Sequence, residues 1–296
     1  MSLVKELNEV NFGQVLTAMV TPFDHKGNID FTKTTKLTEY LIDNGTEALV
    51  VGGTTGESPT LTTEEKLALF GHVVKVVDGR VPIIAGTGNN NTYASVELTK
   101  KAEALGVDGI MAVTPYYNKP SQKGMIEHFT AIANETNLPV MLYNIPGRSV
   151  VNMTADTVIE LSKVANIVSI KEASGDLEQM STIIENTGDQ FSLYSGDDSL
   201  TLPALAIGAT GVVSVSSHII GNEMKSMIDA FYAGQPQQAA AYHRQLLPIM
   251  KGLFLAPNPT CVKAALQIKG LDVGSVRLPL IPLTRTERDH LLQLLQ

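Results

Sequence analysis

The feature of this sequence that most constrains its fold is a regular alternation of short apolar runs with longer amphipathic stretches. The runs are rich in β-branched residues, and most are apolar throughout, as parallel strands buried on both faces are. Eight runs are found, at Val15–Val20, Ala48–Val51, Val81–Ala85, Gly109–Val113, Pro139–Tyr143, Ile167–Ile170, Phe191–Tyr194 and Gly211–Val215.

The stretches between the runs have helical periodicity and carry helix-boundary signals. They predict helices at Thr32–Asn44, Thr62–Val77, Thr92–Leu105, Gln122–Thr136, Ala155–Val164, Leu177–Asn186 and Leu200–Ile207. Thr62 followed by Glu65 predicts a capping box. Gly45, Gly106 and Gly188 stand where a helix is expected to end. Eight β/α repeats favour a closed (β/α)8 TIM barrel over an open doubly wound sheet.

Helical patterns continue after the eighth run. They lie at Ile220–Ala233, Gln237–Phe254, Pro259–Ile268 and Thr286–Leu295. No linker rich in Gly, Ser or Pro separates them from the barrel. We therefore expect a (β/α)8 barrel over residues 1–225 and a C-terminal helical extension, residues 226–296, packed on it.

Composition and charge exclude several classes of protein. The net charge of −8 and the pI of about 5.3 argue against a nucleic-acid or membrane-surface partner. No apolar run approaches the ~20 residues that cross a bilayer. Met1–Gly13 has no apolar core, so we expect no signal peptide there. Cys261 is the single cysteine, which fits a reducing compartment, and we expect a cytoplasmic protein.

Several catalytic signatures are missing from the sequence. The six histidines form no spaced pair on one helix, so we expect no bound metal. There is no P-loop and no nucleophile elbow. Gly86-Thr87-Gly88 is not followed by the rest of a dinucleotide fingerprint.

The active site of such a barrel forms at the carboxyl ends of its strands. The segments expected there are Gly52–Ser58, Gly86–Asn90, Thr114–Asn118, Tyr143–Arg148, Lys171–Glu172 and Ser195–Asp198. They carry hydroxyls, tyrosines, one arginine and one lysine. Their glycines suit either close backbone approach to a ligand or ordinary turns: Gly56, Gly86, Gly88 and Gly196.

Lys171 is the most informative of these residues, because it follows the apolar run Ile167–Ile170. A lysine at that position would be desolvated, which favours its neutral amine. A neutral amine can attack a ketone and form an imine, which then accepts electrons from a carbanion at the next carbon. The alternative is an ordinary strand-end lysine in a surface ion pair.

Arg148 and a set of hydroxyls complete the candidate site. Arg148, in a Pro-Gly-Arg loop, could bind a carboxylate through two parallel hydrogen bonds. Thr54, Tyr117 and Tyr143 could form a chain that moves protons to and from an imine. A solvated loop arginine and packing tyrosines are the alternatives. The residues alone thus indicate a barrel enzyme with a candidate lysine nucleophile and an anionic substrate.

Three motifs in combination carry a family resemblance. Gly53–Ser58, Tyr143–Pro146 and the lysine Lys171 ending the sixth strand resemble the pyruvate-dependent class I aldolases. This family includes N-acetylneuraminate lyases and dihydrodipicolinate synthases. The resemblance runs from about Gly13 to Arg277–Leu280, nearly the whole chain.

Within the family the sequence is most similar to the synthase branch. Thr54-Thr55 replaces the Ser-Thr typical of neuraminate lyases, and Thr114–Asn118 follows the synthase pattern. Arg148 stands where the synthases place the arginine that binds a semialdehyde carboxylate. The resemblance implies condensation of pyruvate with L-aspartate 4-semialdehyde and cyclisation of the product. That reaction is the first committed step of diaminopimelate and lysine biosynthesis.

The resemblance also implies catalytic roles. Lys171 would form the imine with pyruvate, and Tyr143 would act as general acid and base beside it. Thr54 would relay protons between Tyr143 and Tyr117. Tyr117 would enter from a neighbouring subunit, which implies a homo-oligomer of at least two chains, with a tetramer expected. No cofactor would be needed, because the imine itself supplies the electron sink.

Binding roles follow from the same resemblance. Thr55, together with Thr54, would bind the pyruvate carboxylate. Arg148 would hold the semialdehyde at the mouth of the pocket. Gly196 and Val213 would line the pocket with backbone groups.

One departure from the family pattern concerns regulation. Members inhibited by L-lysine have a glutamate at the position of Ala94 and histidines at the positions of Thr63 and Lys66. Here the carboxylate that would pair with the ligand's ammonium is missing, and Lys66 adds a like charge. We therefore expect weak or absent feedback inhibition.

Three alternative functions remain at this stage. Another pyruvate-dependent aldolase acting on a sugar acid is disfavoured by Arg148. A non-catalytic family member that binds a small carboxylate is disfavoured because a binder has no use for Lys171 and a proton relay. A metal-dependent barrel enzyme is the most distant alternative.

Overall fold

The computed structural model describes residues 11–296, so most of Met1–Gly13, where no signal peptide is expected, lies outside the described residues. Within residues 11–296, eight parallel strands pair in chain order and close into a barrel, since β8 pairs with β1. They are β1 Val15–Ala18, β2 Ala48–Val51, β3 Ile83–Gly86, β4 Gly109–Val113, β5 Val140–Asn144, β6 Ile167–Glu172, β7 Ser192–Ser195 and β8 Gly211–Ser214. The predicted (β/α)8 barrel is confirmed.

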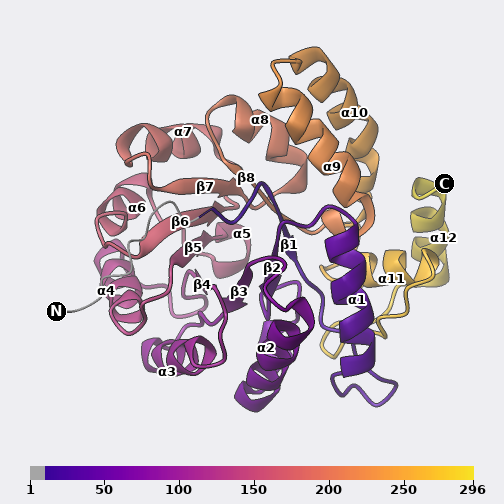
Figure 1. Ribbon diagram of the computed structural model, residues 1–296, viewed down its shortest axis with the longest axis horizontal. Coiled ribbons are helices and arrows are strands. Elements are labelled where there is room, and N and C mark those ends of the chain that lie inside the picture. The colour runs from indigo at the N-terminus through magenta and orange to yellow at the C-terminus, as the bar shows by residue number, and fades with distance from the viewer. Residues whose placement is uncertain (1–10) are drawn as a thin grey trace.

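Helices follow the strands and surround the barrel (Figure 1). They are α1 Phe31–Asp43, α2 Thr63–Val77, α3 Thr92–Glu103, α4 Gln122–Ala133, α5 Pro146–Ser149, α6 Ala155–Leu161, α7 Leu177–Asn186, α8 Thr201–Ala206 and α9 Ser217–Tyr232. Short 3-10 turns lie at η1 Ser58–Thr60 and η2 Asp198–Leu200. In the part of the chain that the structure describes, no helix is both long and apolar enough to cross a bilayer.

The C-terminal region consists of α10 Pro236–Gly252, α11 Thr260–Ile268 and α12 Arg285–Leu294. These helices lie beside α1 and α9 on one side of the barrel (Figure 1, orange to yellow). A buried cluster joins α9 to α10 through Met224, Met227, Leu246 and Met250. The helical extension is thus present. Its predicted division from the barrel at residue 225 falls inside α9 and stays a prediction.

Two element boundaries differ from the prediction at the site. β5 continues through Asn144, and β6 continues through Lys171 and Glu172, because ladder hydrogen bonds use the backbone whatever the side chain is. Arg148, predicted in a loop, lies instead in the single helical turn α5. Pro146 begins this turn, a position where its missing N–H costs nothing.

The predicted helix boundaries are largely confirmed. Thr62 and Glu65 form the expected capping box at the start of α2, with bonds of 3.2 and 2.9 Å. Gly45 and Gly106 adopt the left-handed conformation after α1 and α3, each with φ of 86°. Gly188 follows α7 without it, because the extended Thr187 ends that helix.

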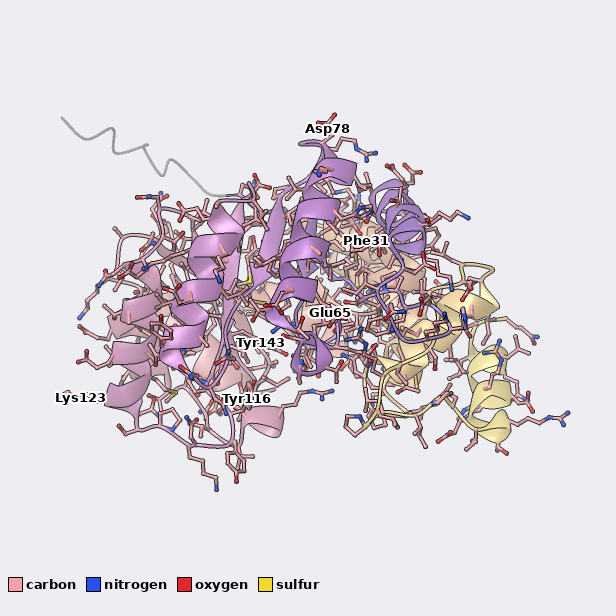
Figure 2. The ribbon with its side chains drawn as sticks, turned by 90° about the horizontal axis from the view of Figure 1, so that it is seen from below. Phe31, Glu65, Asp78, Tyr116, Lys123 and Tyr143 are labelled. Carbon is pink, nitrogen blue, oxygen red and sulfur yellow. The ribbon has the colours of Figure 1, made fainter. Side chains whose placement is uncertain are left out.

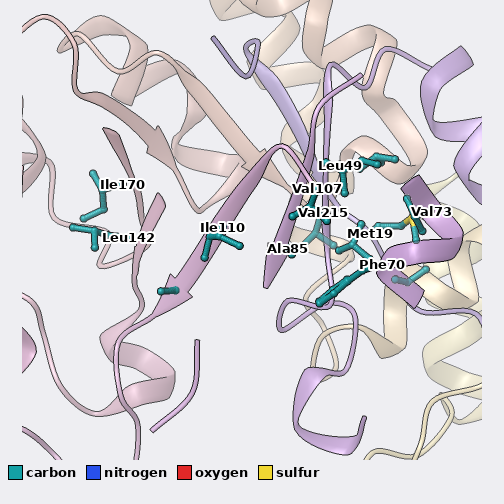
Figure 3. Close-up of a cluster of buried hydrophobic side chains, with 14 of the residues drawn as sticks. Met19, Leu49, Phe70, Val73, Ala85, Val107, Ile110, Leu142, Ile170 and Val215 are labelled. Carbon is teal, nitrogen blue, oxygen red and sulfur yellow. The ribbon is translucent and has the colours of Figure 1, made fainter. Parts of the chain in front are cut away.

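Apolar side chains fill both the outside and the inside of the barrel. Figure 3 shows part of the outer layer, where Phe70 and Val73 of α2 pack toward Leu49 of β2 and Ala85 of β3. A second cluster fills the interior, with members Phe12, Leu16, Ala18, Ala48, Val50, Ile84, Met111, Met141, Tyr143, Tyr194 and Val213. The interior is therefore a packed core. Polar groups that face inward near the strand ends lie against apolar side chains.

Candidate active site

A cavity of about 230 Å³ opens among the segments that follow β2 to β5. Its lining is Gly52, Gly53, Thr54, Ser58, Pro59, Gly86, Gly88, Met111, Val113, Tyr116, Tyr143, Ile145, Arg148 and Ser149. Glu65 marks the start of α2 in Figure 2, and Asp78 marks its end. Tyr116 and Tyr143 lie on the side of Glu65, far from Asp78. The structure thus brings Thr54, Tyr143 and Arg148 together at the carboxyl ends of the strands.

Lys171 enters the barrel from β6 and is 5% exposed. It does not line the cavity directly, but its Nζ lies 4.3 Å from the centre of the Tyr143 ring. Burial lowers the pKa of Lys171 to about 8; Asp198 opposes this shift, and the charge of Arg148 adds to it. A useful fraction of the amine is therefore neutral near neutral pH, which nucleophilic attack on a ketone requires.

Tyr143 is buried at the end of β5, directly opposite Lys171 in the strand register. Burial raises the pKa of its phenol to about 12, although Thr54 and the charge of Arg148 act in the opposite direction. The phenol is therefore protonated at neutral pH. It lies beside the amine with a hydrogen to give, as a general acid does.

Arg148 lies on α5, exposed at the rim of the cavity. The turn is held in place by Ser149, whose hydroxyl lies 3.0 Å from the Ile145 carbonyl oxygen and 2.8 Å from that of Val151, either of which can accept its hydrogen. An exposed guanidinium at a cavity rim can receive a carboxylate from solvent through two parallel hydrogen bonds.

A buried polar network, missed by the sequence analysis, supports the segment that carries Arg148. Asn144 donates to Glu172 at 3.0 Å and to Asn152 at 2.7 Å, and it accepts from the backbone of Met153 at 2.9 Å. Burial is the main cause that raises the pKa of Glu172. Tyr143-Asn144 and Lys171-Glu172 therefore send alternate side chains to opposite faces of the barrel wall. The first of each pair faces the site, and the second fixes the segment behind it.

Thr55 and Tyr117 lie outside the cavity lining. Thr55 is buried, and its hydroxyl accepts a hydrogen bond from Asn258 at 2.9 Å. Tyr117 is 88% exposed and has a φ of 73°, which directs it away from the core. Within residues 11–296 of one chain, Tyr117 therefore does not meet Tyr143.

Gly196 lies against the Lys171 side chain, and Val213 lies in the barrel interior. A Cβ at Gly196 would meet the Ala173 Cβ at 2.6 Å and two carbons of the Lys171 side chain at 3.2 Å, so glycine leaves space for both residues. Val213 shares the interior cluster with Tyr143. Neither residue lines the cavity directly, so their part in the pocket stays a prediction.

Backbone packing explains why positions 86 and 88 are glycines, whether or not a ligand binds beside them. Cβ atoms there would meet the Gly52 carbonyl oxygen at 2.7 Å and the Val113 nitrogen at 2.4 Å. Close approach of neighbouring backbone segments therefore requires glycine at both positions. Each also lines the cavity, because a bare backbone leaves it open.

Asp198 is a second feature that the sequence analysis did not single out. This buried carboxylate accepts from Ser214, from the Ser216 backbone at 2.9 Å and from the Ser216 hydroxyl at 2.7 Å. Its negative charge limits the lowering of the pKa of Lys171. The Gly-Asp-Asp stretch after the seventh strand was the available signal. Which of its two carboxylates turns inward depends on the tertiary fold.

Across the described residues 11–296, no three His, Cys, Asp or Glu side chains converge as a metal-ligand set. That the protein needs no metal stays a prediction from the sequence.

Comparison with known proteins gives consistent results. The family model described as the Dihydrodipicolinate synthetase family matches residues 11–296. The chain is 70% identical over 282 residues to 4-hydroxy-tetrahydrodipicolinate synthase 2 of Halalkalibacterium halodurans, covering 95% of this chain and 97% of the relative. It is 63% identical over 280 residues to the Bacillus subtilis 4-hydroxy-tetrahydrodipicolinate synthase, covering 94% and 97%. A crystal structure of a dihydrodipicolinate synthase from Bacillus anthracis superposes with a TM-score of 0.95, at 64% identity and with 96% and 98% coverage.

Proposed function

The chain belongs to the dihydrodipicolinate synthetase family, and on this basis we propose that it condenses pyruvate with L-aspartate 4-semialdehyde. It is a class I, Schiff-base lyase of diaminopimelate and lysine biosynthesis, and its product is 4-hydroxy-tetrahydrodipicolinate. The observation that carries the mechanism is the buried Lys171, with its pKa lowered to about 8, against the Tyr143 ring.

The first half of the reaction forms the imine. The neutral Nζ of Lys171 attacks C2 of pyruvate, and the ketone oxygen takes up protons and leaves as water. Tyr143, protonated at neutral pH, supplies a proton to that oxygen and later receives one back. The resulting protonated imine draws electrons away from C3, so that C3 can lose a proton and become an enamine.

The second half forms the carbon–carbon bond and the ring. The enamine C3 attacks the aldehyde carbon of the semialdehyde, whose oxygen is protonated to a hydroxyl. The amino group of the semialdehyde portion then attacks C2 and displaces Lys171, which closes the ring and frees the enzyme. In this proposal Thr54 carries protons between Tyr143 and Tyr117.

The two substrates bind through different groups. Thr54 and Thr55 hold the pyruvate carboxylate near Lys171, with Gly196 and Val213 lining the pocket. Arg148 holds the semialdehyde carboxylate, and its exposed place at the cavity rim supports this role. The positive charge of Arg148 and the hydroxyl donors offer local partners for these two carboxylates within a protein of net charge −8.

The proposal extends to assembly and cellular setting. Tyr117 acts in the site of a neighbouring copy of the chain, so the active unit is a homo-oligomer of at least two chains and is expected to be a tetramer. Its large exposed area supports this role, since an exposed aromatic ring is available for burial by a partner. No cofactor, nucleic acid or membrane takes part, and the enzyme works in the cytoplasm.

A comparison of candidate substrates, each supplied separately, tests the proposed function. The purified protein is given pyruvate with L-aspartate 4-semialdehyde, and separately a panel of 2-oxo sugar acids for cleavage. The proposal predicts turnover of the semialdehyde and none of the sugar acids. Preferred cleavage of a sugar acid would assign the protein to another branch of the family. Pyruvate binding without turnover of either would indicate a non-catalytic carboxylate binder.

A further inference from the structure

We propose that Asn258 is a positioning residue that turns the Thr55 hydroxyl toward the pyruvate carboxylate. Asn258 lies in the segment between α10 and α11, in the C-terminal region rather than the barrel. The inference rests on the proposed function, in which Thr55 binds that carboxylate. It gives the C-terminal region a part in recognising the first substrate, exerted through Thr55.

The contact joins two buried side chains 203 residues apart in the sequence. Asn258 Nδ2 donates to Thr55 Oγ1 at 2.9 Å, and the two residues are 8% and 3% exposed. Away from water, a hydroxyl cannot turn freely between alternative partners, so its neighbours decide where its hydrogen points.

The direction of the bond determines what Thr55 can do. A hydroxyl has one hydrogen, and here its oxygen is already occupied by the amide N–H of Asn258. Among residues 11–296, Thr55 makes no other side-chain hydrogen bond, so its own hydrogen remains available for an acceptor. A substrate carboxylate is such an acceptor, and hydrogen bonds to ionised groups are the stronger kind.

The other end of the Asn258 amide supports a functional role. Its Oδ1 is buried and has no hydrogen-bond partner in the described part of the chain. A buried, unpaired acceptor is destabilising, so this asparagine is a poor solution for stability. An apolar residue of similar size would avoid that cost but could not donate to Thr55.

Contacts other than that of Asn258 also hold the loop. Glu57, two residues after Thr55, has a left-handed φ of 57° and is anchored independently. Lys263 Nζ lies 2.6 Å from its Oε1, and the Arg277 backbone N–H donates to its Oε2 at 2.8 Å. With the backbone fixed by these two contacts, loss of Asn258 acts on the Thr55 hydroxyl rather than on the loop.

The test compares Asn258→Asp and Asn258→Ala with the wild type. An aspartate has the same shape but accepts the Thr55 hydrogen, which removes the donor and adds a negative charge. We expect the pyruvate KM to rise about tenfold or more in Asn258→Asp and less in Asn258→Ala. We expect the KM for the semialdehyde to stay within about twofold of the wild-type value. Reduction with borohydride traps the imine between Lys171 and pyruvate. The pyruvate concentration that gives half-maximal trapping is a second readout, independent of turnover.

Two controls separate positioning from a merely structural role. In a Thr55→Val background, Asn258→Ala should cause no further rise in the pyruvate KM, because its target hydroxyl is gone. Asn166→Asp makes the same chemical change at the other end of the barrel. Asn166 directly precedes β6, and its side-chain amide donates to three backbone carbonyls. It should lower the Tm without changing the pyruvate KM.

The outcomes distinguish this inference from the proposed function. A wild-type protein that neither traps pyruvate nor turns it over contradicts the proposed function. A wild type that traps pyruvate, with unchanged trapping midpoints in both Asn258 variants, overturns this inference alone. Equal rises in both KM values, or full additivity with Thr55→Val, overturn it as well. If Asn258→Asp does not fold, Asn258→Ala and its double variant decide.

Discussion

Two buried lysines show how the surroundings of one residue type determine its use. Burial lowers the pKa of both Lys171 and Lys263 to about 8. Lys263 forms an ion pair with Glu57 and donates to the Ser275 carbonyl at 2.9 Å. Lys171 has no carboxylate within ion-pair distance in residues 11–296. The amine without such a partner is the one available for chemistry.

This contrast predicts opposite effects on stability. Lys171→Met should raise the free energy of unfolding at pH 7 by about 1–3 kcal/mol, because it removes an uncompensated buried amine. Its folded pKa lies below the unfolded value of 10.5, so the cost is full below pH 8 and fades as pH rises toward 10.5. The stabilisation should therefore shrink between pH 7 and pH 10. Urea unfolding of variant and wild type at both pH values measures this.

Lys263→Met is the matched control. It leaves Glu57 buried without its partner, so it should lower the free energy of unfolding by about 3–5 kcal/mol. Destabilisation of similar size in both lysine variants would mean that Lys171 is also held by an interaction that stabilises its charged form.

The same pKa predicts how imine formation depends on pH. The rate of adduct formation at low pyruvate concentration should rise about tenfold from pH 6 to 7 and level off above pH 8. Asp198→Asn removes a negative charge that favours the ammonium, so it should move the inflection to lower pH. Mass spectrometry of adducts trapped with cyanoborohydride gives the rates. A shift to higher pH in Asp198→Asn would show that Asp198 is not acting through its charge.

The short turn α5 carries Arg148, the residue proposed to bind the carboxylate of the second substrate. Arg148→Lys keeps the positive charge but loses the planar pair of donors. We expect the semialdehyde KM to rise about 10–100-fold while pyruvate trapping is unchanged, because Arg148 lies at the rim and not beside Lys171. Steady-state kinetics with each substrate varied in turn gives both values. An equal loss of pyruvate trapping would place Arg148 in the first substrate's site.

The sequence predicts the long elements well because their signals are local. Apolar runs and capping residues such as Thr62 act within a few positions. The strands, most helices and the place of Lys171 can therefore be predicted from the sequence. The turn α5 is missed because four residues have no periodicity and Pro-Gly is typical of a loop. The Asn144–Glu172 and Asn258–Thr55 contacts are missed because only the closed fold brings such distant residues together.

Feedback inhibition by L-lysine is predicted to be weak or absent. Lys66 is buried, and burial lowers its pKa, while Ala94 offers no carboxylate for a ligand's ammonium. Titration with L-lysine should leave the activity essentially unchanged at sub-millimolar concentrations. Strong inhibition in that range would mean that other groups bind the amino acid.

Assembly can be tested by mixing two inactive variants. Lys171→Ala and Tyr117→Phe each damage one part of the site, and a heterodimer would contain one site with both parts intact. Co-expression should restore activity to about a quarter of the wild-type level, from random pairing of the two chains. Because Tyr117 is 88% exposed, it is free to reach a partner. No recovery in a mixture shown to contain heterodimers would mean that Tyr117 does not act across the interface.

The proposed mechanism begins with an imine between Lys171 and pyruvate, and chemical trapping can detect this imine. The protein is incubated with pyruvate and sodium borohydride, and the adduct is located by peptide mass spectrometry. We expect a reduced pyruvyl adduct on Lys171 that disappears in a folded Lys171→Ala variant. No adduct on folded wild-type protein, or an adduct on Lys263 instead, would contradict it.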